Sequence, residues 1–339
     1  MRTSIQIALT LAIFTATSFC CTLGSAADQA PTEIKIATWN LEWFFDHDQS
    51  DNKSPLAKKL SAPTAADWHW KRDEAARVIA KIKPTILALQ EIENKKVVQE
   101  LAEVLKTQHG LEYQVAFIKG RDTYTEQDVA FLYTSGFEKC ERREQTKTMY
   151  DSKQYYNLSK HLFATFRWLT PTGHQTLTIC NVHLRAGERG AAPRLRQCRL
   201  LQHWTKPMIA NDENVIVIGD INTPCVCDNV SAGDDLALLC GTTGLPSSSS
   251  LFDLHLKLLS SQRTTHMAGK QFGHLLVSPA LLADTDSEHD LIFSSIETAK
   301  QLVINGEQDT DHFNGYYSIP SHERDVSDHY PVVAIFKIK

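Results

Sequence analysis

The sequence predicts an α/β fold in which two mixed β-sheets pack together and helices cover their outer faces. Three features of the chain support this fold class. Short apolar runs with strand-like spacing recur along the chain, segments with helical spacing separate several of them, and in the middle of the chain strand-like runs follow one another directly. Alternating strands and helices favour parallel pairing, whereas consecutive strands favour antiparallel pairing, so the sheets are expected to be mixed.

The first part of the chain has the order strand, helix, strand, helix, strand. Alternating or continuous apolar residues predict strands over residues 33–39, 86–89 and 113–118. Apolar residues at helical spacing predict helices over residues 70–82 and 94–107. Pro84 ends the first helix because proline cannot continue it, and Gly110 ends the second because glycine adopts the left-handed conformation of a helix C-terminus.

The second part of the chain contains mostly short strands. They are predicted over residues 129–133, 163–168, 177–183, 215–218, 275–277 and 332–338. One helix is predicted over residues 194–206. The polar tracts 247–250 and 284–289 are predicted to be surface loops. Two stacked sheets with outer helices accommodate this order of elements.

Residues 1–27 have the pattern of a secretory signal peptide. Arg2 precedes a largely apolar run, and small residues follow it up to Ala27. Threonines interrupt the apolar run, which is shorter than the ~20 residues that a membrane-spanning helix needs. We expect cleavage after Ala26 or Ala27, a secreted or periplasmic location, and a single domain over residues 28–339.

The charge of the chain does not by itself indicate a nucleic-acid-binding protein. The full sequence has 35 basic and 40 acidic residues and a net charge of −5. Loss of the signal peptide removes Arg2 alone among the charged residues, so the mature balance is 34 minus 40, or −6. A net negative protein has no overall electrostatic attraction to a polyanion, so any such attraction must be local.

Six cysteines remain after removal of the signal peptide: Cys140, Cys180, Cys198, Cys225, Cys227 and Cys240. An even number in a chain directed to an oxidising compartment predicts disulfides. Six cysteines allow fifteen complete pairings, and we expect one bridge in the region of Cys225, Cys227 and Cys240. The spacing of the Cys-Val-Cys segment does not fit a zinc knuckle.

Polar side chains stand directly after four predicted strands and before a fifth. They are Asn40, Glu91, His183, the pair Asp220 and Asn222, and the pair Asp328 and His329. Carboxylates hold hard cations, histidines transfer protons, and amides position a phosphate or a water. Each residue alone is more often a cap or a turn residue. Together they favour metal-dependent hydrolysis of a phosphoester.

The segments around these residues resemble the motifs of the endonuclease/exonuclease/phosphatase superfamily, in that family's order. They are TWNLE at 38–42, LQEIEN at 89–94, NVHLR at 181–185, GDIN at 219–222 and SDHYP at 327–331. The resemblance extends over residues 38–331, nearly the whole mature chain. It implies a DNase I-like, four-layer α/β sandwich with the site at one rim of the two packed sheets.

The resemblance also implies a metal ion and a general base. Mg²⁺ or Mn²⁺ would be held chiefly by Glu91, with Asn40 and Asp328 as further ligands, and Asp328 would also belong to the catalytic set. His329 would remove a proton from the attacking water. General-base catalysis of this kind contributes about 10²- to 10⁴-fold to the rate.

Four further residues are implied to handle the substrate. Asp220 and Asn222 would orient the water and the phosphate. His183 would donate a hydrogen bond to the phosphate or its leaving oxygen. Arg185, together with Asn222 and His183, would contact the substrate phosphate.

One position departs from the family pattern. The segment FGHLLVS at 272–278 matches the family strand that carries an Asp, and Gly273 stands at the position of that Asp. In the family this carboxylate orients and charges the catalytic imidazole, so His329 is expected to use another acceptor or to be less effective. The substitution leaves open a non-catalytic, secreted binding protein. We predict that Gly273→Asp raises turnover if the protein is an enzyme.

The substrate is less well defined by the sequence. Five arginines, Arg185, Arg189, Arg194, Arg196 and Arg199, follow His183 closely and form a local basic segment that favours a polyanion. Aromatic and basic residues alternate over 147–160, as in single-strand binding grooves, although an ordinary solvated surface has the same pattern.

The Glu91 motif together with a signal peptide resembles secreted bacterial nucleases, which makes DNA or RNA the expected substrate. A phospholipase of the sphingomyelinase type or a phosphatase remains the enzymatic alternative. The loops contain no run of bulky apolar residues of the kind that inserts into membranes. We therefore expect a monomer without stable membrane association.

Overall fold

The computed structural model describes residues 31–171, 173–224, 231, 233–283, 291–306 and 312–338. The expected signal peptide at 1–27 and the expected loop at 284–289 lie outside these residues. Within the described ranges, every helix is too short or too polar to cross a membrane.

The first sheet has six strands in the order β11-β12-β1-β2-β4-β3. Their bounds are β11 Leu291–Thr298, β12 Val332–Ile338, β1 Glu33–Phe44, β2 Ile86–Ile92, β4 Asp128–Tyr133 and β3 Gln114–Ala116. The pair β1 and β2 is parallel, and the other neighbours are antiparallel. The sheet is therefore mixed, as the order of helices and strands predicts.

The second sheet also has six strands, in the order β5-β6-β7-β8-β10-β9. Their bounds are β5 Phe137–Glu141, β6 His161–Thr170, β7 Gly173–His183, β8 Val215–Asp220, β10 Gly273–Val277 and β9 Phe252–Asp253. Here β7 and β8 are parallel and the remaining neighbours are antiparallel. Each sheet thus contains one parallel pair near its centre.

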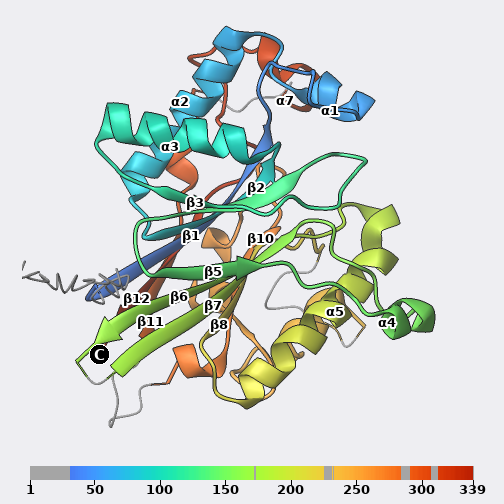
Figure 1. The fold of residues 1–339 in the computed structure, drawn as a ribbon. Helices are drawn as coiled ribbons and strands as arrows, with labels where there is room; N and C mark the ends of the chain where they lie inside the picture. Colours follow the sequence, from blue (N-terminus) through green and yellow to red (C-terminus); the bar gives the residue numbers. More distant parts are fainter. Residues whose placement is uncertain are drawn as a thin grey trace, which may run out of the picture.

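Helices cover the outer face of each sheet, as Figure 1 shows. Helices α2 (Ala65–Ile82) and α3 (Lys95–His109) pack on the first sheet, and α5 (Ala191–Ala210) and α6 (Asp235–Cys240) pack on the second. A third apolar core, drawn from strands of both sheets, fills the space between them. The order helix, sheet, sheet, helix is the four-layer sandwich that the motifs imply.

The ends of α2 and α3 follow from local chemistry. The Thr64 hydroxyl caps α2 by accepting the Asp67 N–H at 3.2 Å, and the helix ends at Ile82, with Lys83 as its C-cap just before Pro84. Asn94 caps α3 by accepting two backbone N–H groups, and Gly110 ends it with a φ of +66°. Both predicted stops are confirmed.

Several short elements are absent from the sequence prediction. They are α1 (Pro55–Leu60), α4 (Lys147–Ser152), α7 (His312–Gly315), β5, β9 and β11. The outer part of β11 alternates only weakly between buried and exposed side chains, and α4 buries none of its residues, so their sequences contain little periodic signal. Strand β1 also continues past the predicted end at 39 as far as Phe44.

The expected disulfides are not seen at the cysteines of the strands. Cys140 and Cys180 are free thiols, in contrast to the expectation that the mature cysteines pair. Cys180 is buried under α5, and this burial raises the pKa of its thiol. The bridge expected in the region of Cys225, Cys227 and Cys240 involves Cys225 and Cys227, which lie outside the described residues.

Candidate active site

The candidate site lies where the parallel pairs of the two sheets end. In the first sheet Asn40 is aligned with Gln90, the residue before Glu91, and in the second His183 is aligned with Asp220. Carboxyl ends of parallel strands lie at the same edge of a sheet, and the two sheets place these edges side by side. The residues predicted from strand ends therefore meet at one rim of the sandwich.

Asn40 connects the two sheets directly. Its Nδ2 donates to Glu91 Oε1 at 3.0 Å and to Asp220 Oδ2 at 2.9 Å, while its Oδ1 accepts the Glu42 N–H at 2.9 Å. The side chain is only 3% exposed. An amide that bridges two buried carboxylates limits their mutual repulsion and fixes their separation.

Unusual backbone geometry positions the Glu91 carboxylate. Glu91 has a φ of +59°, at a register shift between β2 and its neighbours, and Glu42 and Trp43 have φ values of +48° and +47°. Such left-handed conformations are uncommon for residues other than glycine. The turn at the end of β1 directs the Trp43 N–H to Glu91 Oε2 at 2.9 Å, so both carboxylate oxygens have a donor.

His183 lies between two of the acids. Its Nε2 is 3.8 Å from Glu91 Oε1 and 3.7 Å from Asp220 Oδ2. Burial, with the positive charge of Lys160, lowers the pKa of His183 well below its usual value, so the imidazole is neutral at physiological pH. Its Nδ1 is buried without a hydrogen-bond partner among the described residues. A neutral ring can still donate one N–H.

Asp220 and Asn222 form a compact turn after β8. Asp220 Oδ1 accepts the Asn222 N–H at 2.9 Å, and Asn222 Nδ2 donates to the Leu184 carbonyl at 3.2 Å. Asn222 has a φ of +56°, a conformation that asparagine tolerates better than most residues. This arrangement keeps the Asn222 amide beside Asp220 and next to the chain that carries His183.

His329 lies between Asp220 and Asp328. Its Nε2 is 3.6 Å from Asp220 Oδ2 and 3.8 Å from Asp328 Oδ1. Its backbone is held by two contacts, since its N–H donates to Ser327 Oγ at 3.0 Å and its carbonyl accepts Trp39 Nε1–H at 2.9 Å. Burial, assisted by His266, lowers the pKa of His329 to about 3, so its ring is neutral.

His266 is a site residue that the sequence analysis did not identify. Its Nδ1 accepts the Ala268 N–H at 2.9 Å, so its Nε2 carries the proton and donates to Asp328 Oδ2 at 3.1 Å. Its ring meets that of His329 edge to face, with centroids 4.6 Å apart. His266 stands in an irregular loop and reaches the site through a β-bridge to His329, which no local pattern indicates.

Glu42 is the second residue that the analysis of single positions missed, although it belongs to the TWNLE motif. Its Oε2 accepts the Asp328 N–H at 3.0 Å and His312 Nε2–H at 2.7 Å. Burial alone would raise the pKa of Glu42, but the His312 hydrogen bond and nearby Lys71 hold it below the usual value. Glu42 thus stays ionised and positions the backbone of Asp328.

A buried lysine adds positive charge behind the acids. Lys160 Nζ donates to Gln127 Oε1 at 3.0 Å and lies 3.5 Å from Asp122 Oδ2. Burial lowers the pKa of Lys160, and attraction to Asp122 and then Glu91 opposes that shift. The positive charge of Lys160 also acts to lower the pKa of Asp220, so Lys160 influences the acids of the site. It is at the same time the last residue of the basic-aromatic stretch 147–160.

The donor set fits a divalent metal ion. Burial raises the pKa values of Glu91 and Asp220, and burial together with the charges of Glu42 and Glu91 raises that of Asp328 well above its usual value. Asp328 Oδ1 is buried without a hydrogen-bond partner among the described residues. Oxygen ligands around an excess of negative charge suit Mg²⁺ or Mn²⁺. The ligand atoms of Glu91, His183 and Asp220 lie within 4.8 Å of one another, as do those of His266, Asp328 and His329, whereas Asn40 directs its Nδ2 and not its oxygen toward Glu91.

Arg185 lies outside this acidic group. It is exposed, its Nη2 contacts the Tyr156 hydroxyl at 3.4 Å, and its guanidinium lies 5.8 Å from the Tyr156 ring centroid. Arg185 and Tyr156 help to line an open pocket of about 550 Å³ that also includes Tyr150, Tyr155, Arg121 and Arg196. The structure thus gathers part of the basic-aromatic stretch around Arg185.

Other arginines of the same segment have structural partners. Arg194 is buried, forms an ion pair with Asp235 and donates to the Arg185 carbonyl at 2.8 Å. Arg199 Nη1 donates to the Gln154 carbonyl at 2.8 Å. Arg194 is therefore unable to contact a polyanion at the surface. Fewer arginines of this segment are available to bind a polyanion than its sequence indicates.

Gly273 is not required by packing. It pairs with Asp220 across β10 and β8, and its N–H donates to Thr265 Oγ1 at 2.9 Å. A Cβ at this position would lie 3.5 Å from Thr265 Oγ1 and 3.8 Å from Val332 Cγ2, which are ordinary contact distances. A side chain can be placed here without a clash.

The chain belongs to the Endonuclease/Exonuclease/phosphatase family, whose sequence profile matches residues 35–338. Members of this superfamily are generally metal-dependent phosphoester hydrolases. No curated protein sequence matches the chain significantly.

Solved structures share the fold at low sequence identity. An endonuclease/exonuclease/phosphatase from Bacteroides vulgatus is 13% identical with a TM-score of 0.53, covering 91% of this chain and 100% of that one. A humanized D. rerio TDP2 carrying 14 mutations is 16% identical with a TM-score of 0.54, covering 91% and 100%. The human Nocturnin catalytic domain with bound sulfate is 15% identical with a TM-score of 0.54, covering 91% and 94%. At these identities the likeness establishes the fold.

Proposed function

We propose that this protein is a metal-dependent phosphodiesterase that hydrolyses DNA or RNA. The observation that carries the proposal is the alternation of carboxylates and imidazoles along the rim. His183 lies between Glu91 and Asp220, and His329 lies between Asp220 and Asp328, with the four N···O separations between 3.6 and 3.8 Å. Such an array can bind a cation and transfer protons within one small volume.

In the proposed reaction, water attacks phosphorus in line with the leaving oxygen. His329, whose Nε2 lies between Asp220 and Asp328, takes the proton of the attacking water. Asp220 and the neighbouring amide of Asn222 orient that water and the phosphate. His183 donates its N–H to the phosphate or the leaving oxygen. Mg²⁺ or Mn²⁺, when bound, neutralises the negative charge that develops on the phosphate oxygens.

Two surface features support a nucleic acid as the substrate. The pocket around Arg185 combines guanidinium groups with three tyrosine rings, which suits a phosphate backbone and stacked bases. Phe313 is 64% exposed and stacks on His266 with an interplanar angle of 8°. An exposed ring this close to His329 can support a base beside the scissile phosphate.

We also propose that residues 1–27 are removed as a signal peptide and that residues 28–339 act as one secreted or periplasmic catalytic domain. The mature protein would be a monomer without stable membrane association. These proposals rest on the apolar N-terminal pattern and on the continuous family match over 35–338.

The proposal is tested by incubating supercoiled plasmid and a single-stranded RNA with the purified mature protein and Mg²⁺ or Mn²⁺. Cleavage should be abolished by EDTA and by His329→Ala. The matched control is His322→Ala, because the His322 side chain is 78% exposed and lies outside the site. Hydrolysis of sphingomyelin or a phosphomonoester instead of both nucleic acids would contradict the nuclease assignment. Inactivity on all substrates would favour a binding protein with Gly273 in place of the family Asp.

A further inference from the structure

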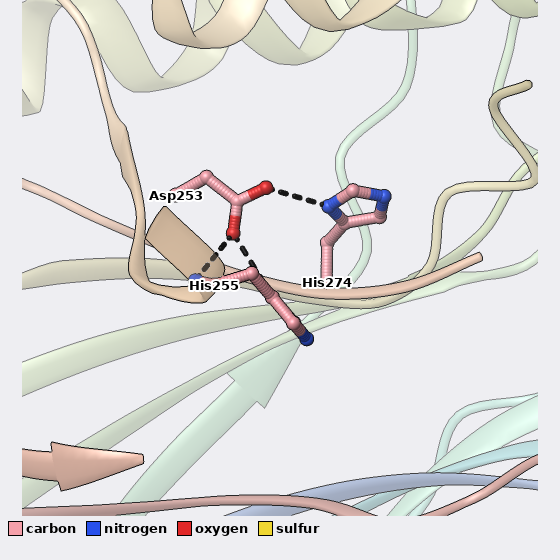
Figure 2. Close-up of side chains that lie close together, drawn as sticks. All are labelled: Asp253, His255 and His274. Atoms are coloured by element: carbon pink, nitrogen blue, oxygen red, sulfur yellow. Dashed lines mark hydrogen bonds and ion pairs between the residues drawn. The ribbon is translucent and has the colours of Figure 1, made fainter. Parts of the chain in front are cut away.

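A second cluster of metal-binding side chains lies outside the candidate active site. It contains Asp253 at the end of β9, His255 in the short helix η2 (Leu254–Lys257) and His274 in β10. Their exposed fractions are 1%, 0% and 0%. Figure 2 shows the Asp253 carboxylate with one oxygen directed to each histidine. Oδ1 is 3.0 Å from His255 Nδ1, and Oδ2 is 2.8 Å from His274 Nδ1.

The cluster faces away from the space between the sheets. Asp253 is paired with Leu276, which packs beneath α5 and α6, whereas Leu275 packs between the sheets. Because side chains alternate along a strand, His274 points to the same outer side as Leu276, and Gly273 points to the opposite side. The cluster therefore lies on the outer face of β10, whereas Gly273 lies on the inner face.

The tautomer of His274 creates a need for a cation. His274 Nε2 is 3.0 Å from the Gln271 carbonyl, which can only accept, so Nε2 carries a proton. In a neutral ring Nδ1 then has a lone pair, and that lone pair faces a carboxylate oxygen at 2.8 Å. The contact becomes attractive with a proton on the ring nitrogen or on the carboxylate, or with a metal ion bound between the two atoms. A ring N–H donated to a backbone carbonyl is the usual support of a metal-bound histidine.

Two buried polar atoms of the cluster lack partners. Neither His255 Nε2 nor Gln271 Oε1 has a hydrogen-bond partner among the described residues, and Gln271 is only 4% exposed. His255 Nε2 points away from Asp253, so Gln271 Oε1 is the unpartnered atom that the ion could engage. The other end of the Gln271 amide, Nε2, lies 3.3 Å from His274 Nδ1 and 3.4 Å from Asp253 Oδ2. The two ends of an amide have the same shape. Rotation of this amide would direct Oε1 toward both of these ligand atoms.

We propose that Asp253, His255 and His274 bind a structural divalent transition-metal ion, with the Gln271 amide oxygen as a fourth ligand. Two imidazole nitrogens and two oxygens suit zinc better than Mg²⁺ or Ca²⁺. Tetrahedral zinc bonds would place the ligand atoms roughly 3.3 Å apart. One ligand atom from each of the three residues already lies within 4.8 Å of the other two, so binding of the ion requires the side chains to adjust around it. The absence of solvent exposure favours a closed structural site over an open catalytic one.

The test measures metal content in the full mature chain, independently of activity. The protein is loaded with zinc, passed over a chelating resin and analysed by mass spectrometry of metals. We expect about one zinc per chain in the wild type and in Glu91→Gln, which removes the carboxylate of the proposed catalytic ion. Asp253→Asn and His274→Gln should lower the retained zinc at least tenfold, whereas the exposed control His322→Ala should not.

Spectroscopy on the zinc-loaded Glu91→Gln protein avoids the risk that cluster variants do not fold. X-ray absorption should show two imidazole nitrogens and oxygen ligands around zinc. Retention of no zinc by the wild type, or unchanged zinc in a folded Asp253→Asn variant, would overturn the proposal. Failure of this test leaves the nuclease proposal unaffected, because it concerns different residues.

Discussion

The Asn40 amide joins the two sheets at the rim, because the same Nδ2 that donates to Glu91 at 3.0 Å also donates to Asp220 at 2.9 Å. Glu91 follows the central parallel strands of one sheet, and Asp220 ends the central parallel strands of the other. The separation of the two acids therefore depends on how the two sheets pack together. The acids therefore cannot separate without loss of a buried hydrogen bond.

Removal of this bridge should reduce both stability and activity. Asn40→Ala removes the side-chain donor to Glu91 Oε1 and Asp220 Oδ2, leaving the backbone N–H groups of Trp43 and Asn222 on their other oxygens, and costs about 1–3 kcal/mol of unfolding free energy. Urea unfolding in EDTA measures this change. Mg²⁺ should recover part of the loss, because a bound cation compensates the unpaired charge. A variant as stable as the wild type in EDTA would contradict this role of Asn40. Asn211→Ala, exposed at the C-terminal end of α5, is the control.

Gly273→Asp should raise kcat on a nucleic acid substrate. The position accommodates a Cβ without a clash, and a carboxylate near His329 would favour the protonated ring that forms as water is deprotonated. Gly273→Asn has nearly the same shape without the charge and should not increase kcat. An equal or lower kcat in Gly273→Asp would show that His266 and Asp328 already provide the support that the imidazole needs.

The pocket around Arg185 should affect KM more than kcat. Tyr156→Ala removes a ring beside two arginines and should raise KM for a long single strand several-fold. Hydrolysis of a small chromogenic phosphodiester should stay unchanged, because that substrate does not reach the pocket. Arg185→Gln should also reduce the dependence of binding on salt. Equal losses on both substrates would place these residues in the chemistry instead.

Buried His161 should make the fold sensitive to acid. Its Nδ1 contacts the Leu158 carbonyl at 2.8 Å and its Nε2 accepts the Arg143 N–H at 3.1 Å, which fixes a neutral ring. Burial, with nearby Arg142, lowers its pKa to about 3, below the value of about 6.5 expected when unfolded. The unfolded state therefore takes up the proton first as the pH falls. The stabilisation is complete above about pH 6.5 and is lost toward pH 3.

Urea unfolding at about pH 7.5 and about pH 5 measures this dependence. One such histidine contributes a loss of about 2 kcal/mol over that interval. His161→Gln removes the titrating group, so its unfolding free energy should fall less between the two pH values than that of the wild type. An identical fall in both proteins would show that other groups cause the acid sensitivity.

The central strands and the motif residues could be predicted from sequence for a physical reason. Buried strands such as β2 and β8 are continuous apolar runs, and the polar residue that ends each run must face solvent or a ligand. Parallel pairing then brings Asn40 beside Glu91 in one sheet and His183 beside Asp220 in the other, and the packing of the two sheets joins these ends. The order of elements was therefore enough to predict the layers, whereas the roles of the polar residues came from the motifs.

Contacts made through irregular segments could not be predicted in this way. His266 reaches His329 through an isolated bridge, and His312 reaches Glu42 from the short helix α7. Their sequence neighbourhoods have no helical or strand periodicity. In the arginine-rich segment the sequence instead predicted a surface cation where there is none. Arg194 is buried and forms an ion pair with Asp235. Charge alone does not reveal a partner distant in sequence.

The central claim is that Glu91 holds a metal ion needed for phosphodiester hydrolysis. The most direct measurement is the rate of cleavage of a labelled oligonucleotide as Mg²⁺ is titrated, for the wild type and for Glu91→Gln. We expect saturable activation of the wild type and a loss of about 10²-fold or more in Glu91→Gln at every Mg²⁺ concentration. Equal activity of the two proteins, or cleavage by the wild type that persists in EDTA, would contradict the account.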